Sequence, residues 1–276
     1  MKLLRITALL LALLFCVSLW GGCTGSEENV LSIAVLDVGQ SDCILLSLGD
    51  RHMLIDAGSA TQRAAVLGEL SARGVDELEY LLVTHAHEDH YGNARAVLET
   101  RPVGTLLVPE GATEDLGYGL VLQSAEDTKT ATEALRDGDS FYFGDACIEV
   151  FCALSQDAEG NNASLVLRIS FGECVLLFMG DAEKEAEQTL LSRDTEWDCD
   201  FLKVGHHGSR TACSQDFLAA TTPQIAAISC GKNNDYGFPH REVLQGLVEI
   251  AATIYRTDEK GNLNFICDGK SVIYEE

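Results

Sequence analysis

Three histidines and two acidic residues are concentrated in the hexapeptide His85-Ala86-His87-Glu88-Asp89-His90. The whole chain has 7 histidines, so this concentration argues against an ordinary polar loop. The apolar run at residues 80–83 lies just before it and has the pattern of a short buried strand. The hexapeptide therefore begins the loop at the carboxyl end of a strand, where α/β proteins commonly place their sites.

The spacing within the hexapeptide indicates metal binding. In an extended or turning loop, His85 and His87 point to the same side and can bind one ion. Asp89 and His90 lie past the bend and are free to reach a second ion. Imidazole and carboxylate ligands together suit zinc, manganese or iron, whereas calcium prefers oxygen ligands alone.

Two further segments supply candidate ligands after predicted strands. Asp181 follows the strand predicted for residues 174–179, and its carboxylate could bridge two ions; the alternative is a helix N-cap. His206 and His207 follow the strand predicted for residues 201–204. One of the pair is expected to complete the second metal site, and the other to contact substrate or donate a proton. The sequence does not decide between them, and we assign His206 as the ligand and His207 as the catalytic group.

The elements that must position these residues form two strand-rich halves, each followed by strands that alternate with helices. This order predicts an α/β fold with two facing sheets and helices outside them. Residues 111–136 are acidic and have no clear pattern. The predicted strands are residues 30–38, 43–48, 52–55, 80–83, 103–108, 141–143, 147–152, 164–170, 174–179, 201–204, 225–229, 254–255 and 263–266, and the predicted helices are 62–72, 94–99, 183–192, 215–220 and 242–251.

The N-terminus has the pattern of an export signal. Lys2 and Arg5 come before an apolar run at residues 6–20, and two glycines come before Cys23. Residues 1–23 thus resemble a lipoprotein signal, with cleavage before Cys23 and lipid on its thiol.

Trp20 departs from the usual lipoprotein pattern, so an uncleaved anchor and cleavage without lipid remain as alternatives. Residues 24–29 are predicted to be a polar tether, and residues 30–276 the folded domain. In each case we expect the protein outside the cytoplasm, either lipid-anchored at the cell membrane or secreted.

Composition limits the partners. Without Lys2 and Arg5, 17 basic residues remain against 43 acidic ones, a formal charge of −26. This charge repels nucleic acid and anionic lipid headgroups at long range, so a polyanionic substrate must be held locally. The cysteines after Cys23 form no Cys-x-x-Cys pair, and their apolar surroundings favour buried core residues over a disulfide framework.

These motifs together resemble the metallo-β-lactamase-fold hydrolases, and within them the branch that contains the hydrolase domain of ComEC competence proteins. The matching segments lie in order at residues 36–42, 54–58, 85–90, 161–167, 180–181, 202–209, 234–240 and 255–258. The resemblance implies a four-layer αβ/βα sandwich with metals at one sheet edge.

The resemblance also implies roles for individual residues. It gives the first ion to His85 and His87, the second to Asp89, His90 and one histidine of the later pair, with Asp181 as the bridge. Asp56 would orient a ligand from behind. Further residues expected behind the ligands or against the substrate are Asn162, Lys203, Tyr236, His240 and Arg256.

The chain departs from the family pattern at several positions. Asn161 and Asn162 stand where most members of the wider fold supply a third histidine to the first ion, so this site is expected to bind weakly or to prefer manganese. Ser41 replaces a usual glycine, and Gly92-Asn93 replaces a glycine pair. Phe238 stands where a histidine is common, which leaves His240 alone and puts substrate handling in doubt.

The sequence therefore predicts an exported metal-dependent hydrolase, with a phosphodiester as the preferred substrate. One or two zinc or manganese ions would activate water and polarise a phosphoryl oxygen, with Asp89 or Asp181 accepting the proton. We expect a monomer that acts on a small molecule, a short phosphodiester or nucleic acid. The alternatives are hydrolysis of a lactone, lactam or other acyl bond, and a non-catalytic accessory of DNA uptake.

Overall fold

The computed structural model describes residues 29–111, 115–152 and 160–276, which form two β-sheets and the helices that cover them. The first sheet has the order β15-β14-β1-β2-β3-β4-β5-β6. Its strands are β1 (Leu31–Val35), β2 (Ile44–Leu48), β3 (Arg51–Ile55), β4 (Leu78–Leu82), β5 (Val103–Pro109), β6 (Ala131–Leu135), β14 (Leu263–Cys267) and β15 (Val272–Glu275).

The second sheet has the order β13-β12-β11-β10-β9-β8-β7. Its strands are β7 (Ser140–Phe143), β8 (Ala146–Cys152), β9 (Leu165–Phe171), β10 (Cys174–Phe178), β11 (Phe201–Lys203), β12 (Ile225–Ile228) and β13 (Thr253–Arg256). The α-helices are α2 (Arg63–Ala72), α3 (Glu88–Tyr91), α4 (Ala94–Thr100), α5 (Leu116–Thr128), α6 (Lys184–Leu191), α7 (Gln215–Thr221), α8 (Arg241–Glu249) and α9 (Thr257–Lys260).

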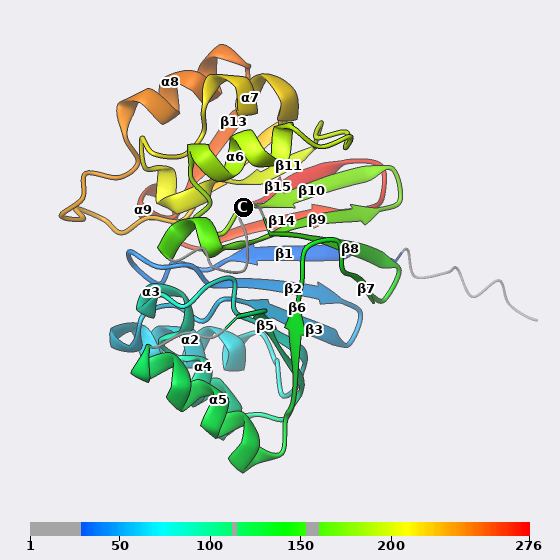
Figure 1. Cartoon of the computed structure of the whole chain (residues 1–276), viewed down its shortest axis with the longest axis vertical. Helices are drawn as coiled ribbons and strands as arrows, with labels where there is room; N and C mark the ends of the chain where they lie inside the picture. Colours follow the sequence, from blue (N-terminus) through cyan, green and yellow to red (C-terminus); the bar gives the residue numbers. More distant parts are fainter. Residues whose placement is uncertain (1–28, 112–114, 153–159) are drawn as a thin grey trace, which may run out of the picture.

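The sheets and helices form four layers. Helices α2, α4 and α5 cover the outer side of the first sheet, and α6, α7 and α8 cover the outer side of the second (Figure 1). The predicted four-layer α/β sandwich is confirmed.

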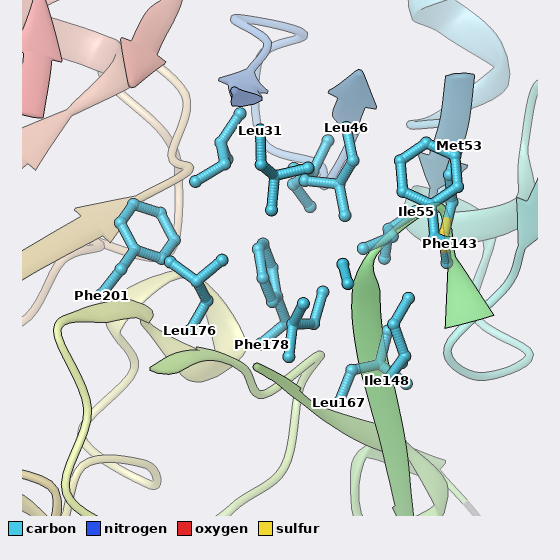
Figure 2. Packing of buried hydrophobic residues seen from close by; sticks show 14 of the residues in the cluster. Leu31, Leu46, Met53, Ile55, Phe143, Ile148, Leu167, Leu176, Phe178 and Phe201 are labelled. Atoms are coloured by element: carbon cyan, nitrogen blue, oxygen red, sulfur yellow. The ribbon is translucent and has the colours of Figure 1, made fainter. Parts of the chain in front are cut away.

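The alternation of side chains along each strand builds this arrangement. In β2, Ile44, Leu46 and Leu48 face the second sheet, whereas Leu45 packs under the helices of its own half. Figure 2 shows Leu46 and its neighbours on one side of the central core and Phe178 of the second sheet on the other. Both faces of the central strands are buried, which explains why strands such as β2 and β10 are almost continuously apolar in sequence.

Strand direction places the functional segments. Strands β3, β4, β5 and β6 are parallel, and so are β10, β11, β12 and β13. Parallel neighbours end at the same edge of a sheet, so the loops after β4, β10 and β11 can share one site.

The stretch at residues 111–136, which has no clear sequence pattern, contains α5 and β6. Two features hide α5 in the sequence: Leu116 and Leu120 are exposed, and Gly117 lowers helix propensity. A Cβ at Gly117 would lie 2.4 Å from the hydroxyl of Tyr91, so the glycine allows α5 to approach α3, the short helix that contains the end of the histidine hexapeptide.

The part of the chain that the structure describes contains no helix long and apolar enough to cross a membrane. Among these residues, six of the eight cysteines are buried and the remaining two are half-buried, and none is in a disulfide. The predicted signal at residues 1–23 with Cys23, and residues 24–28 of the predicted tether, lie outside the described residues.

Phe178 tests the packing between the sheets. Its side chain is 1% exposed in the central core, so Phe178→Ala should lower the free energy of unfolding by about 3–5 kcal/mol. The control is Ile273→Ala on edge strand β15, where the side chain is 54% exposed and the loss should be about 0.5 kcal/mol or less. Urea denaturation measures both losses, and equal losses would contradict the placement of the core.

Candidate metal centre

The loops after β4, β10 and β11 bring together two groups of side chains that share Asp181. In each group the potential ligand atoms all lie within 4.8 Å of one another. The Asp89 cluster consists of Asp89, His90, Asp181 and His207, and the His85 cluster consists of His85, His87 and Asp181.

The Asp89 cluster is compact and mostly buried. His90 Nε2 lies 3.3 Å from Asp181 Oδ2, and His207 Nε2 lies 3.4 Å from Asp89 Oδ2 and 3.8 Å from Asp181 Oδ2. Three of these four side chains are buried, and Asp89 is half-buried at the edge. Two neutral imidazoles and two carboxylates are a donor set that suits divalent transition metals.

The His85 cluster lies beside it. His85 Nε2 and His87 Nδ1 are 3.0 Å apart, and the two rings meet edge to face. Gly160, in the short helical turn just before β9, lies against His87, since a Cβ there would be 4.0 Å from His87 Nε2. This cluster therefore has two imidazoles and a shared carboxylate. The asparagine side chains of the 160–163 turn contact Glu183 and His206.

Three buried polar atoms show that the clusters fit a cation. His90 Nε2, His207 Nε2 and Asp181 Oδ1 have no hydrogen-bond partner among the described residues. Buried polar atoms are normally hydrogen-bonded, and leaving one without a partner is costly. All three atoms belong to residues of the Asp89 cluster, so a divalent metal is supported as the missing partner.

A carboxylate behind His90 fixes the orientation of its ring. Asp56 Oδ2 accepts from His90 Nδ1 at 2.7 Å, and Asp56 also accepts from the backbone N–H and hydroxyl of Thr84 at 2.8 Å each. Because a carboxylate accepts the proton on Nδ1, the lone pair of Nε2 faces the cluster. Asp56 thus acts through His90.

His207 is oriented in a similar way by groups that sequence reasoning missed. Its Nδ1 lies 3.1 Å from the carbonyl oxygen of Ser229 and 3.4 Å from Asp42 Oδ1. Both oxygens are acceptors, so Nδ1 carries the proton and Nε2 faces the cluster. Asp42 is in turn paired with Lys203 Nζ at 2.7 Å, and both side chains are 1% exposed.

The Asp42–Lys203 pair changes the role expected for Lys203. Its ammonium group is buried behind His207 and does not reach substrate. A lysine in an otherwise apolar strand was the sequence signal for a buried counter-charge, because lysine is almost never buried without a partner. A third group of possible ligands, formed by Asp42, Asp56 and His90, is already compensated by this ammonium and by the proton on His90.

The electrostatics of the clusters favour positive charge. Burial raises the pKa of Asp181, but His90 and His207 outweigh it and hold that pKa well below its usual range. Burial lowers the pKa of His207, but Asp181 and Asp42 outweigh it and raise that pKa to about 10. Burial and the neighbouring His90 keep the pKa of His85 well below its usual value, so this imidazole is neutral and keeps a free lone pair.

The histidine pair lies on a strained turn after β11. His206 and His207 both have left-handed backbones, with φ of 47° and 52°. Such conformations cost non-glycine residues about 1–3 kcal/mol each and are concentrated at functional sites. Gly208 continues the turn at φ 80°, and a Cβ there would lie 2.6 Å from Pro239. In this turn the two adjacent imidazoles point in different directions.

The geometry favours His207 over His206 as the candidate ligand of this pair. His207 belongs to the Asp89 cluster, whereas His206 Nε2 is 4.0 Å from Asp181 Oδ2 and its ring is partly exposed. His206 Nδ1 lies 3.1 Å from Glu183 Oε1. The sequence could not separate the two, because the conformation of the turn decides which of two adjacent histidines reaches the cluster, and both residues have a left-handed backbone.

Two other predicted site residues, Asn162 and Arg256, contact protein groups outside the clusters. Asp181 is not a helix cap, because α6 begins at Lys184 with Glu183 at its N-cap position. Asn162 Oδ1 accepts from the backbone N–H of Glu183, so it acts through that residue. Arg256 is engaged by Asp258 and Glu259.

The clusters open into a pocket of about 450 Å³. Tyr236 and Phe238 line it, whereas His240 does not; its Nδ1 accepts the backbone N–H of Arg210. The other lining residues are Gln40, Ser59, His87, Glu88, Asp89, Asp181, His206 and His207.

A sequence model of the metallo-beta-lactamase superfamily matches residues 36–232. The chain belongs to this superfamily. ComE operon protein 3 of Bacillus subtilis is 34% identical over 262 residues, which are 88% of this chain and 33% of that protein. Competence protein ComA of Neisseria gonorrhoeae is 29% identical over 242 residues, which are 86% of this chain and 32% of that protein. The predicted resemblance to ComEC-type competence proteins is confirmed, and the chain spans about a third of the length of these relatives.

A solved member of the superfamily has the same fold. The metallo-beta-lactamase fold protein YhfI from Bacillus subtilis aligns with a TM-score of 0.59 at 12% identity, over 87% of this chain and 100% of that chain. At this identity the likeness concerns the fold.

Alanine variants of the histidine pair test the cluster assignment. His207→Ala should weaken zinc or manganese binding at least tenfold, since ligand loss costs no less than the roughly 10–100-fold loss seen for residues behind ligands. His206→Ala should bind close to the normal amount, because its ring lies outside both clusters. Metal content after dialysis, measured by mass spectrometry, decides the matter, and the reverse result would return the ligand role to His206.

The buried Asp42–Lys203 ion pair should contribute strongly to the free energy of unfolding. Lys203→Met leaves the Asp42 carboxylate without its ammonium partner, so the free energy of unfolding should fall by about 3–5 kcal/mol. Adding Asp42→Asn removes the uncompensated charge and should recover part of this loss. Urea denaturation of the single and double variants measures the coupling, and purely additive losses would refute it.

Proposed function

We propose that this chain is a metal-dependent phosphodiesterase, acting on short phosphodiesters or nucleic acid with one or two zinc or manganese ions. One observation carries the proposal: two adjacent candidate metal clusters share Asp181 and face a single pocket. Two ions held side by side suit the in-line displacement of a phosphodiester, because they can stabilise both the attacking and the leaving oxygen. The competence relatives support nucleic acid as a substrate.

Divalent ions in these clusters would supply activated water and polarisation of a phosphoryl oxygen. The chain supplies the proton transfers. Asp89 is half-buried at the pocket edge, and His207 and His90 lower its pKa against the effect of burial, so it is ionised and can accept a proton from water. His206 lines the same pocket with Glu183 behind its Nδ1, which suits a donor to the leaving oxygen.

The negative charge of a substrate would be bound by metal ions in the clusters more than by basic side chains. Lys203 is buried against Asp42, and Arg256 is engaged by Asp258 and Glu259, so neither offers free charge to a phosphate. The chain as a whole carries a formal net charge of −24. This combination favours short substrates over long duplex DNA, because long polyanions need an extended basic surface.

We place this activity outside the cytoplasm, on a protein exported by residues 1–23 and anchored through lipid on Cys23. The support is the sequence pattern of that segment.

His87→Ala tests the proposed function. The metal-loaded protein should cleave bis(p-nitrophenyl) phosphate and short single-stranded DNA, and the variant should lose on the order of a hundredfold or more in kcat, since it lacks a predicted ligand. His52→Ala is the matched control, because His52 lies on β3 and contacts Ser47 away from the pocket.

The same assay includes plasmid DNA and a chromogenic lactam. Cleavage of the lactam alone would give the site to acyl hydrolysis. No cleavage of any substrate by protein that binds metal would favour a non-catalytic accessory of DNA uptake.

A further inference from the structure

Aromatic rings continue outward from the Asp89 cluster. The Phe238 ring is stacked with His207 at 6.4 Å between centroids and 21° between planes, and Tyr236 is stacked with Phe238 at 5.3 Å and 19°. The three rings are thus nearly parallel, and all three residues line the pocket. This series of rings, His207-Phe238-Tyr236, leads from a candidate metal ligand to the pocket rim.

The segment that carries Tyr236 and Phe238 is braced by hydrogen bonds. Asn234 Nδ2 donates to the carbonyl oxygens of Gly231 and Phe238, and Asn234 Oδ1 accepts from the N–H of Phe238. The segment is also fixed to the histidine turn, since the N–H of His240 donates to the carbonyl oxygen of Gly208. The backbone on both sides of Phe238 is therefore fixed relative to the histidine turn.

Tyr236 is exposed to an extent that needs an explanation. Its side chain is 67% exposed although it belongs to a large aromatic residue at a pocket rim. Phe238 covers one face of the ring, and no other ring contact of Tyr236 occurs among the described residues. A flat partner can therefore stack on the other face, continuing the series by one ring.

Resting on the proposed phosphodiesterase function, we propose that Tyr236 and Phe238 form a stacking platform for an unpaired nucleobase next to the scissile phosphodiester. Every base has a π-face, so such a platform binds without regard to base identity. It also needs no positive charge, which suits a strongly acidic chain. A base inside a duplex is stacked already, so the platform selects single-stranded ends over duplex DNA and over wall polymers that lack bases.

Phe238 connects the exposed ring to the metal centre. Its apolar ring stands between Tyr236 and His207. His206 and His240 approach the Phe238 ring edge-on, at 5.5 and 5.1 Å between centroids. Phe238 is thus packed among three aromatic side chains and His207 of the Asp89 cluster, and it supports the inner face of the Tyr236 ring.

A binding measurement tests the platform without turnover. The probe is 2-aminopurine deoxyriboside 5′-monophosphate, a monoester whose fluorescence is quenched when its base stacks, added to the full protein with Zn²⁺. Tyr236→Ala should weaken quenching on the order of tenfold, the effect expected for loss of one base–aromatic stack, whereas Tyr236→Phe should retain it. Tyr142→Ala is the matched control, because Tyr142 is 65% exposed on β7 and does not line the pocket.

A cleavage measurement then separates this inference from the function on which it rests. The substrates are a short single-stranded oligodeoxynucleotide and the same backbone with abasic sites. The wild-type protein should cleave the base-bearing strand about tenfold faster in kcat/KM, and Tyr236→Ala should remove most of that difference.

Each outcome is decisive. Equal cleavage of the two strands, or unchanged quenching in Tyr236→Ala, overturns the platform while leaving the phosphodiesterase intact. No cleavage of either strand by the wild type refutes the proposed function, and the quenching series still decides whether the rings bind a base.

Discussion

Three carboxylates, Asp42, Asp56 and Asp181, are buried around the two imidazoles of His90 and His207, and the rest of the site depends on compensating their charge. An uncompensated buried carboxylate is strongly unfavourable, so each must find a cation or several hydrogen bonds. Lys203 compensates Asp42, and the Thr84 and His90 donors satisfy Asp56. Asp181 has the imidazoles of His90 and His207 beside its carboxylate, and one atom of each of these three side chains has no hydrogen-bond partner among the described residues. The buried negative charge that still needs a positive partner is therefore that of Asp181, which the two clusters share.

The charged groups of the site come from both sheets, which meet at one edge. The Asp42–Lys203 pair connects the loop after β1 in the first sheet to β11 in the second, across 161 residues of sequence. The carbonyl oxygen of Ser229, which follows β12, lies beside the same Nδ1 atom of His207 as Asp42. Each imidazole is thus oriented by groups from elements other than its own, which makes the site a product of the whole sandwich rather than of one loop.

The departures from the family pattern affect the two sides of the site differently. Asn93, in place of a glycine, donates to the carbonyl oxygens of Ala57 and Ser59 and so supports the loop beside Asp56. Ser41 accepts from the N–H of Ser59 and reinforces the same loop. Phe238 lies on the open side of the pocket, among the rings that a substrate would meet. Ser41 and Asn93 thus support a loop beside the site, whereas Phe238 lines the pocket.

The sequence by itself determined most strands, most of the longer helices and the metal character of residues 85–90, because these depend on local apolar alternation and on ligand types a few residues apart. The edge strands β6 and β15 were not predicted. The sequence also located Asp181 and the histidine pair, since residues that follow parallel strands meet at one edge. Helix α5 escaped it because exposed leucines and a close-packing glycine blur the helical pattern. The tertiary structure alone decided that His207 rather than His206 joins the cluster, and that Lys203 faces Asp42 rather than substrate. Both outcomes depend on a left-handed turn and on a partner from a distant strand, and neither a backbone angle nor a distant counter-charge is written in the local sequence.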